Sequence, residues 1–131
     1  MSQQTLPEEA IDEHELEDFI QDWHWDENSL RFAKALGTYL FQFINSLTAQ
    51  ELSAKTINKH CDNCWCIGWL ECGYGYRDIF TPGEVFASSY ADYEYEFQRK
   101  VSNSAYAIKA YRTTWRKLYK YTKALGHLQE R

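Results

Sequence analysis

The 131-residue sequence lacks any long apolar run. No stretch approaches the roughly 18 consecutive apolar residues that a membrane-spanning helix needs. Internal repeats, low-complexity tracts and linkers long enough to separate two domains are also missing. The first 30 residues contain no lysine or arginine, a composition that fits neither a secretory signal nor a transit peptide. We therefore expect a cytoplasmic protein with one domain, large enough to bury a core without disulfides or metal.

Common signatures of catalysis are also missing. The four histidines are scattered, and none pairs with a cysteine, serine or carboxylate in a pattern that would activate a nucleophile. The glycine-containing stretch 73–76 resembles a phosphate loop only in composition. Glu94 and Glu96 can form a catalytic acid–base pair only if their segment is a strand, because on a helix their side chains point in different directions. We therefore expect a protein that is not an enzyme.

Four cysteines lie close together between positions 61 and 72. Cys61 and Cys64 form a Cys-x-x-Cys pair, and thiolates with such spacing can hold zinc or carry out redox chemistry. However, Cys61, Cys64 and Cys72 fall on one helical stripe with neighbouring apolar residues, whereas Cys66 points away from it. Four thiols on one straight helix cannot converge on a metal ion. We therefore expect core thiols, no metal and no other cofactor.

Charge is divided unevenly along the chain. Residues 1–30 hold ten carboxylates and no basic residue, whereas residues 31–131 hold 14 basic and 9 acidic groups. We therefore divide the chain into an acidic N-terminal helix or arm, 1–30, and a helical domain, 31–131. The acidic segment is either a solvated helix that aids solubility or a device that tempers the affinity of the basic part.

Apolar residues at helical spacing predict an all-α domain of four or five helices, with orthogonal or bundle-like packing. The first helix is expected over about 7–23, with an apolar stripe and carboxylates on its other faces. Asn28 or Ser29 is expected to cap the second helix, and Ser53 is expected to cap the third.

Two further helices are expected in the second half. Thr81 followed by Pro82 is typical of a helix start, and we expect a helix over 85–100. The alternation of aromatic and acidic residues at 93–97 leaves a strand as the alternative. The last helix is expected from Ser104 to about Leu125, with the next residue, a glycine, ending it.

The last helix carries the strongest functional pattern. Its basic residues recur every three or four positions and so form a stripe of Lys109, Arg112, Arg116, Lys120 and Lys123. Lys117 lies beside this stripe. Such a stripe can follow a phosphate backbone, where each neutralised phosphate releases counterions. The alternatives are a solvated outer face without a ligand, and intramolecular docking of the acidic first helix onto the basic last one.

Two resemblances concern the middle and end of the chain. The segment 52–68, Leu-Ser-Ala-Lys-Thr-Ile-Asn-Lys-His-Cys-Asp-Asn-Cys-Trp-Cys-Ile-Gly, resembles the L-S-x-K-T-(I/L)-x-x-H-x-x-N-x-W-x-(I/L)-G segment of a group of uncharacterised bacterial proteins. Residues 111–121 resemble the closing helix of the same group, so the resemblance covers about residues 30–125. It implies no known activity, and it places Cys64 and Cys66 at positions usually filled by apolar residues.

The order of the helices, with Leu-Ser-x-Lys-Thr-Ile opening one of them, is also similar to the SAM-like core-binding domain of tyrosine recombinases. That module clamps DNA without chemistry. The resemblance implies backbone contacts from Lys55, Thr56, Lys59 and the basic last helix. Residues 127–131 do not have the spacing of the recombinase His-x-x-Arg pair, so strand cleavage is not expected.

The sequence therefore predicts a non-catalytic, helical DNA-binding or DNA-associated accessory module. Its C-terminal helix would bind double-stranded DNA, and its acidic N-terminal arm would modulate the affinity. The alternative is a protein–protein interaction module, either homo-oligomeric or presenting a DNA-mimicking acidic surface, that uses exposed Trp and Tyr side chains. The acidic pI near 5.3 favours this alternative. No membrane partner is expected.

Overall fold

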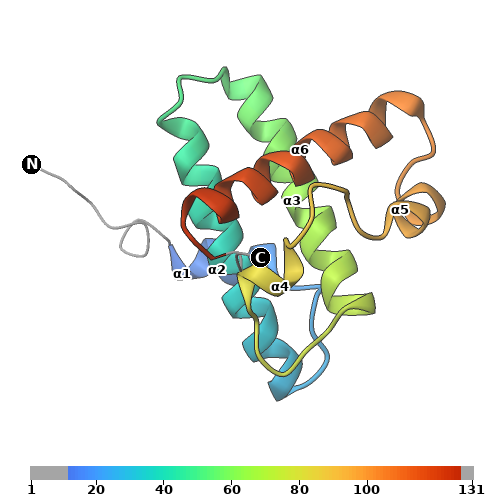
Figure 1. Ribbon diagram of the computed structural model, residues 1–131. Coiled ribbons are helices and arrows are strands. Elements are labelled where there is room, and N and C mark those ends of the chain that lie inside the picture. The colour runs from blue at the N-terminus through green and yellow to red at the C-terminus, as the bar shows by residue number, and fades with distance from the viewer. Residues whose placement is uncertain (1–11, 128–131) are drawn as a thin grey trace, which may run out of the picture.

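The computed structural model describes residues 12–127, which form an all-α domain, as the sequence predicted (Figure 1). The helices are α1 (Glu13–Phe19), α2 (Glu27–Thr48), α3 (Ala54–Tyr74), α4 (Pro82–Val85), α5 (Glu94–Lys100) and α6 (Ala105–Ala124). α2 and α3 run antiparallel as a pair, and α6 crosses them (Figure 1). Within the described range no strand is formed, and no helix is long and apolar enough to span a membrane.

α1 is shorter than the sequence predicted. The Asp12 carboxylate accepts hydrogen bonds from two backbone N–H groups of the first turn, and the helix ends at Phe19. Positions 7–11 of the expected helix lie outside the described residues. Leu16, Ile20 and Trp23 are buried in the core, so the described part of the acidic segment packs with the rest of the domain.

α2 begins earlier than expected, because its N-cap is Asp26 and not Asn28 or Ser29. The Asp26 carboxylate accepts the backbone N–H of Ser29 at 2.8 Å, and the Ser29 hydroxyl accepts the backbone N–H of Asp26 at 3.0 Å. This reciprocal pair is a capping box, in which the buried serine is the inner partner. The apolar residues at helical spacing along α2 are buried, except the half-buried Ile44: Phe32, Leu36, Leu40, Phe43 and Leu47.

α3 begins at the predicted cap, where the Ser53 hydroxyl accepts the backbone N–H of Thr56 at 3.1 Å. The expectation of buried thiols is confirmed for Cys64 and Cys72, whereas Cys61 and Cys66 are only half-buried. Because the four cysteines differ in burial along one helix, α3 carries them without bringing them to a single point.

The expected helix over 85–100 was wrong in its first half. α4 begins at Thr81 and Pro82 as predicted, but it ends at Val85, and regular structure resumes only at α5. Two of the intervening carbonyl groups bond to side chains of α6 instead of to a helix ladder. The Trp115 indole donates to the Ser88 carbonyl at 2.9 Å, and the Tyr111 hydroxyl donates to the Asp92 carbonyl at 2.6 Å.

α6 has the predicted boundaries. Its N-cap is Ser104, whose hydroxyl accepts the backbone N–H of Ala107 at 3.0 Å, and its C-cap is Leu125. Gly126 follows with φ of 79°, a left-handed conformation that glycine adopts without strain. The buried residues of α6 lie at helical spacing on the side that faces the core: Tyr111, Thr114, Trp115, Leu118 and Thr122.

Hydrogen bonds between distant side chains fix α6 across the α2–α3 pair. The Thr114 hydroxyl bonds to His60 Nδ1 at 2.7 Å and accepts from the Asn63 amide at 3.0 Å. The Tyr39 and Thr122 hydroxyls lie 2.7 Å apart. Because these groups are buried, each would cost free energy if it lost its partner, so the crossing position of α6 is well determined.

Candidate nucleic-acid interface

The predicted basic stripe lies on the outer side of α6. We call it the basic face, and it comprises Lys109, Arg112, Arg116, Lys117, Lys120 and Lys123. Since Tyr111, Trp115 and Leu118 are buried, helical periodicity places the basic residues on the opposite side of the helix. All members except the half-buried Lys117 are exposed. The structure therefore brings the predicted residues of α6 together on one solvent-facing surface.

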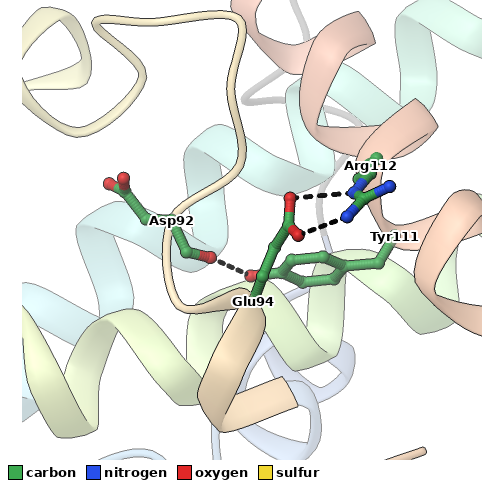
Figure 2. Close-up of polar contacts among 4 residues, drawn as sticks. All are labelled: Asp92, Glu94, Tyr111 and Arg112. Carbon is green, nitrogen blue, oxygen red and sulfur yellow. Dashed lines mark hydrogen bonds and ion pairs between the residues drawn. The ribbon is translucent and has the colours of Figure 1, made fainter. Parts of the chain in front are cut away.

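Arg112 differs from the rest of the basic face because it is already paired. Its guanidinium group donates to both carboxylate oxygens of Glu94, at 3.0 and 2.8 Å (Figure 2). The hydrogen bonds to Glu94 raise the pKa of Arg112. This bidentate contact fastens α5 to α6, beside the Tyr111–Asp92 hydrogen bond (Figure 2). Arg112 therefore links α6 to α5, and the Glu94 carboxylate largely compensates its charge.

The residues implied by the recombinase resemblance lie at the start of α3. Lys55 is exposed, and Lys59 is half-buried with its ammonium nitrogen 4.1 Å from the centre of the Tyr106 ring. Tyr106 belongs to the first turn of α6, so Lys59 lies beside that helix. The Thr56 hydroxyl is bonded to Ser53 at 3.0 Å and takes part in the cap of α3.

A groove of about 330 Å³ runs between α2 and α6 next to the basic face. Lys117 and Lys120 contribute its basic lining, and the rest of its lining comes from Phe43, Ser46, Leu47, Gln50, Tyr121 and Ala124. Sequence reasoning missed the α2 residues because they are uncharged and approach α6 only in the folded protein. The groove provides a mixed apolar and cationic surface beside the lysines.

A second surface, also missed by the sequence analysis, lies where α3 meets α5. We call it the Trp69–Tyr74 groove, a hollow of about 300 Å³ lined by Trp69, Leu70, Gly73, Tyr74 and Lys100. The Lys100 ammonium nitrogen lies 5.7 Å from the Trp69 ring and 5.4 Å from the Tyr74 ring. The only local signal in the sequence was the i, i+4 spacing of two tryptophans, Trp65 and Trp69.

Glu71 is a buried acid near this second surface, and it does not line the groove. It is 1% exposed, and its Oε1 has no hydrogen-bond partner within residues 12–127. Burial, reinforced by the Asp92 carboxylate, raises the pKa of Glu71 to about 8. The acid is therefore largely protonated at neutral pH, which lowers the cost of burying it.

The thiols show a related effect of burial. Burial raises the pKa of Cys66 to about 11 and that of Cys72 to about 12, and it raises the pKa of Cys64 well above its usual value. These thiols therefore stay protonated at neutral pH, whereas metal binding and thiol exchange require the thiolate. Among residues 12–127, no group of three or more His, Cys, Asp or Glu side chains is arranged to hold a metal ion.

The described part of the acidic segment packs away from the basic face. α1 packs against α2, and the Trp23 ring that follows it lies over Gly68 of α3. In the described part of the chain, the ion pairs are Arg77–Glu84 and Arg112–Glu94, so none joins α1 to α6. The carboxylates at 12–27 are exposed to solvent. The structure thus places the acidic helix on the α2–α3 pair and not on the basic helix.

Comparisons with known proteins identify no relative from which a function could be transferred. The chain matches no protein-family model, no curated protein and no solved structure. The resemblances of segment 52–68 and of the helix order to other proteins therefore stay predictions. The basic face and the Trp69–Tyr74 groove are the surfaces that indicate what the chain can bind.

Proposed function

We propose that this protein binds the phosphate backbone of double-stranded DNA through the basic face, as a non-catalytic accessory module. The observation that supports the proposal is the concentration of six cations on the outer side of one 20-residue helix. Within residues 12–127, Arg112 is the single member of this face that is held in an ion pair. The other members are therefore available to phosphates.

The shape of α6 suits a backbone ligand. A helix of this length spans about 30 Å, close to one turn of a DNA duplex. Four of the six cations are lysines, which contact phosphates as flexible point charges and carry no information about base sequence. We therefore propose binding that depends strongly on salt and weakly on sequence.

The acidic segment would reduce this affinity through its electric field. Its described carboxylates, between positions 12 and 27, lie on and around α1 and at the start of α2, and α1 packs on α2. They repel a phosphate backbone without covering the basic face. Since the Debye length is about 8 Å at physiological ionic strength, this repulsion would be strongest at low salt.

Fluorescence anisotropy with a labelled duplex at several salt concentrations tests the proposal. In the test variant, Arg116, Lys120 and Lys123 are replaced by Gln. The matched control replaces Arg31, Lys34 and Arg77 by Gln; these are exposed cations outside α6.

The two variants lose the same charge, so any difference between them belongs to the basic face. We expect the test variant to bind duplexes of different sequence more weakly by a uniform factor. Its log–log salt slope should fall by about 0.9 for each phosphate that the variant no longer neutralises. Equal losses of affinity in both variants, or no duplex binding by the unmodified chain at low salt, would contradict the proposal.

A protein-interaction surface is a second candidate, favoured by exposed apolar side chains in the loops. Trp25 is 62% exposed and rests against Tyr76, and Ile79, three residues further on, is 75% exposed. Trp and Tyr are enriched at protein interfaces, because one end of the ring can stay hydrated. Sedimentation equilibrium of the unmodified chain and of a Trp25→Ser, Ile79→Ser variant tests this candidate: concentration-dependent association that the variant loses would support a homo-oligomer.

A further inference from the structure

Cationic side chains lie over aromatic rings at several places in the described residues. Lys59 lies over Tyr106, Arg99 over Tyr95, and Lys100 over both Trp69 and Tyr74. Three of these four contacts involve the last turn of α5. These contacts are therefore concentrated at the Trp69–Tyr74 groove and on the helix beside it.

The walls of the Trp69–Tyr74 groove are flat and held in place. The Trp69 indole stacks on Trp65 at 5.7 Å between ring centres, with 15° between the planes. Tyr74, 46% exposed, lies at the end of α3 and leans against Tyr93 at 6.0 Å. At Gly73 nothing lies within 4 Å of the position that a Cβ would take, so the groove is open at this point.

The charge in the groove is positive and is carried by a flexible side chain. Lys100 is exposed in the last turn of α5, and in the described part of the chain it forms no ion pair. Its ammonium group lies over the two rings, and its flexible side chain can move aside to hold an anion and uncover them. An aromatic plane next to a free cation is the combination that proteins use for single-stranded nucleic acids, with a base on the ring and a phosphate on the cation.

We infer that the Trp69–Tyr74 groove binds an unpaired base of a single-stranded nucleic acid, with the adjacent phosphate held by Lys100. The inference rests on the proposed function only in taking nucleic acid as the ligand, because the basic face is a separate surface. A base inside a duplex cannot enter the groove, since both of its faces are covered by neighbouring bases. The groove therefore selects single strands, overhangs or unpaired bases.

Binding of a short labelled oligothymidylate by the full chain tests this inference. Tyr74→Ala removes an exposed stacking ring, and its control, Tyr90→Ala, removes a ring that is 82% exposed and lies outside the groove. Stacking on an aromatic ring contributes enough that we expect Tyr74→Ala to weaken binding at least about fivefold. Tyr90→Ala should leave the affinity unchanged.

Two variants that each remove one positive charge distinguish a phosphate contact at Lys100 from the general attraction of the protein for an anionic strand. Lys100→Gln should weaken oligothymidylate binding and lower its salt slope by about 0.7, whereas Lys34→Gln, on α2, should leave both unchanged. A fluorescence measurement needs no change in the groove. In a Trp25→Phe variant, which lacks the most exposed indole of the described residues, oligothymidylate should still quench tryptophan emission, because a base in the groove lies beside Trp69.

The results for the duplex and for the single strand are independent. Loss of duplex binding only in the Arg116, Lys120, Lys123 variant, together with loss of oligothymidylate binding only in the groove variants, would support both surfaces. Groove-dependent binding of the single strand without any duplex binding would support the inference and overturn the proposed function. Equal oligothymidylate affinity in Tyr74→Ala and Tyr90→Ala would overturn the inference, as would binding of an acidic peptide but not of the oligonucleotide.

Discussion

The acidic segment and α6 both pack onto the α2–α3 pair, yet they do so through different kinds of contact. The Trp23 ring lies so close to Gly68 that a Cβ there would be 2.0 Å from it, and the Trp23 indole N–H has no hydrogen-bond partner in the described residues. α6, by contrast, is positioned by hydrogen bonds from Thr114 to His60 and Asn63. One interface depends on shape, and the other depends on paired polar groups.

The difference has a physical consequence for each interface. A shape-dependent contact is sensitive to added volume, because the backbone of α3 cannot move away from a packed ring. A contact built from buried polar groups is sensitive to the loss of one partner, because the other partner then stays buried without a hydrogen bond. Single substitutions can therefore weaken one interface and leave the other intact.

Trp115→Ala is expected to have the largest effect, a loss of about 3–5 kcal/mol in the free energy of unfolding. The ring is 1% exposed, and its indole also holds the Ser88 carbonyl of the loop before α5. Trp23→Ala should cost less, because its indole holds no carbonyl group within the described residues. Chemical denaturation of both variants measures the difference, and a loss below about 1 kcal/mol for Trp115→Ala would show that the ring is not in the core.

Gly68→Ala tests the shape-dependent interface and should cost about 1–3 kcal/mol. The matched control is Gly73→Ala in the same helix, where the added methyl group meets open space. This control should be neutral or slightly stabilising, since alanine favours a helix.

If the Trp23 ring causes the loss of stability, then Trp23→Phe combined with Gly68→Ala should cost less than the sum of the two single changes. Additive losses measured by denaturation would refute the role of this contact.

Thr114→Val tests the polar interface with a side chain of nearly the same shape. It leaves His60 and the Asn63 amide without their shared partner, so we expect a loss of about 1–3 kcal/mol. Thr113→Val is the control, because the Thr113 hydroxyl bonds only to the Lys109 carbonyl of its own helix. Thermal melting compares the two variants, and equal melting temperatures would mean that the buried network contributes nothing.

The polar interface should also respond to pH. Burial, together with Lys117 and Lys59, lowers the pKa of His60 below its usual 6.5, so the folded protein takes up a proton less readily than the unfolded chain. The free energy of unfolding should therefore fall as the pH drops below 6.5, by at most about 1.4 kcal/mol per pH unit.

Glu71 contributes in the opposite sense and has to be removed for this measurement. Its pKa is raised to about 8 from 4.5, so its contribution to stability is lost as the pH rises between these values. In Glu71→Gln, the free energy of unfolding measured between pH 4.5 and 6.5 should fall with falling pH, as expected for His60. If His60→Gln in the same background leaves the slope as it is, another group must be titrating.

The smallest effect is expected from the exposed carboxylates of the acidic segment. Replacing Glu13, Glu17, Asp18 and Asp22 by their amides should tighten duplex binding by about two- to tenfold at low salt and change stability little. Deleting residues 1–30 would not be an equivalent test, because it also removes Leu16, Ile20 and Trp23 from the core. Unchanged affinity, measured by anisotropy, would argue against any modulation by this segment.

Local signals predicted those parts of the fold that local contacts determine. Ser53 and Ser104 cap α3 and α6 with their own side chains, and Gly126 ends α6, so these boundaries were correct. The start of α2 was misplaced because Ser29 is the inner partner of the cap at Asp26. Both residues are good caps, and their separation alone does not say which of them plays that role.

The break at 86–93 and the second surface depend on distant contacts. The carbonyl groups of Ser88 and Asp92 are satisfied by side chains of α6, about 20 residues further along the chain, which no local pattern reveals. The basic face was predictable because helical spacing alone places its members together. The pairing of Arg112 with Glu94 and the approach of Lys100 to Trp69 were not predictable, because each joins two helices.

The hydrogen bond between Tyr39 and Thr122 joins residues 83 positions apart. Closing so large a loop costs conformational entropy, whereas α1, α2 and α3 meet through short connections. During synthesis these three helices leave the ribosome first and can collapse around Trp23 before α6 has emerged. The cations of α6 then join the domain after the carboxylates of α1, and the part of the nascent chain before α6 is strongly acidic until they do.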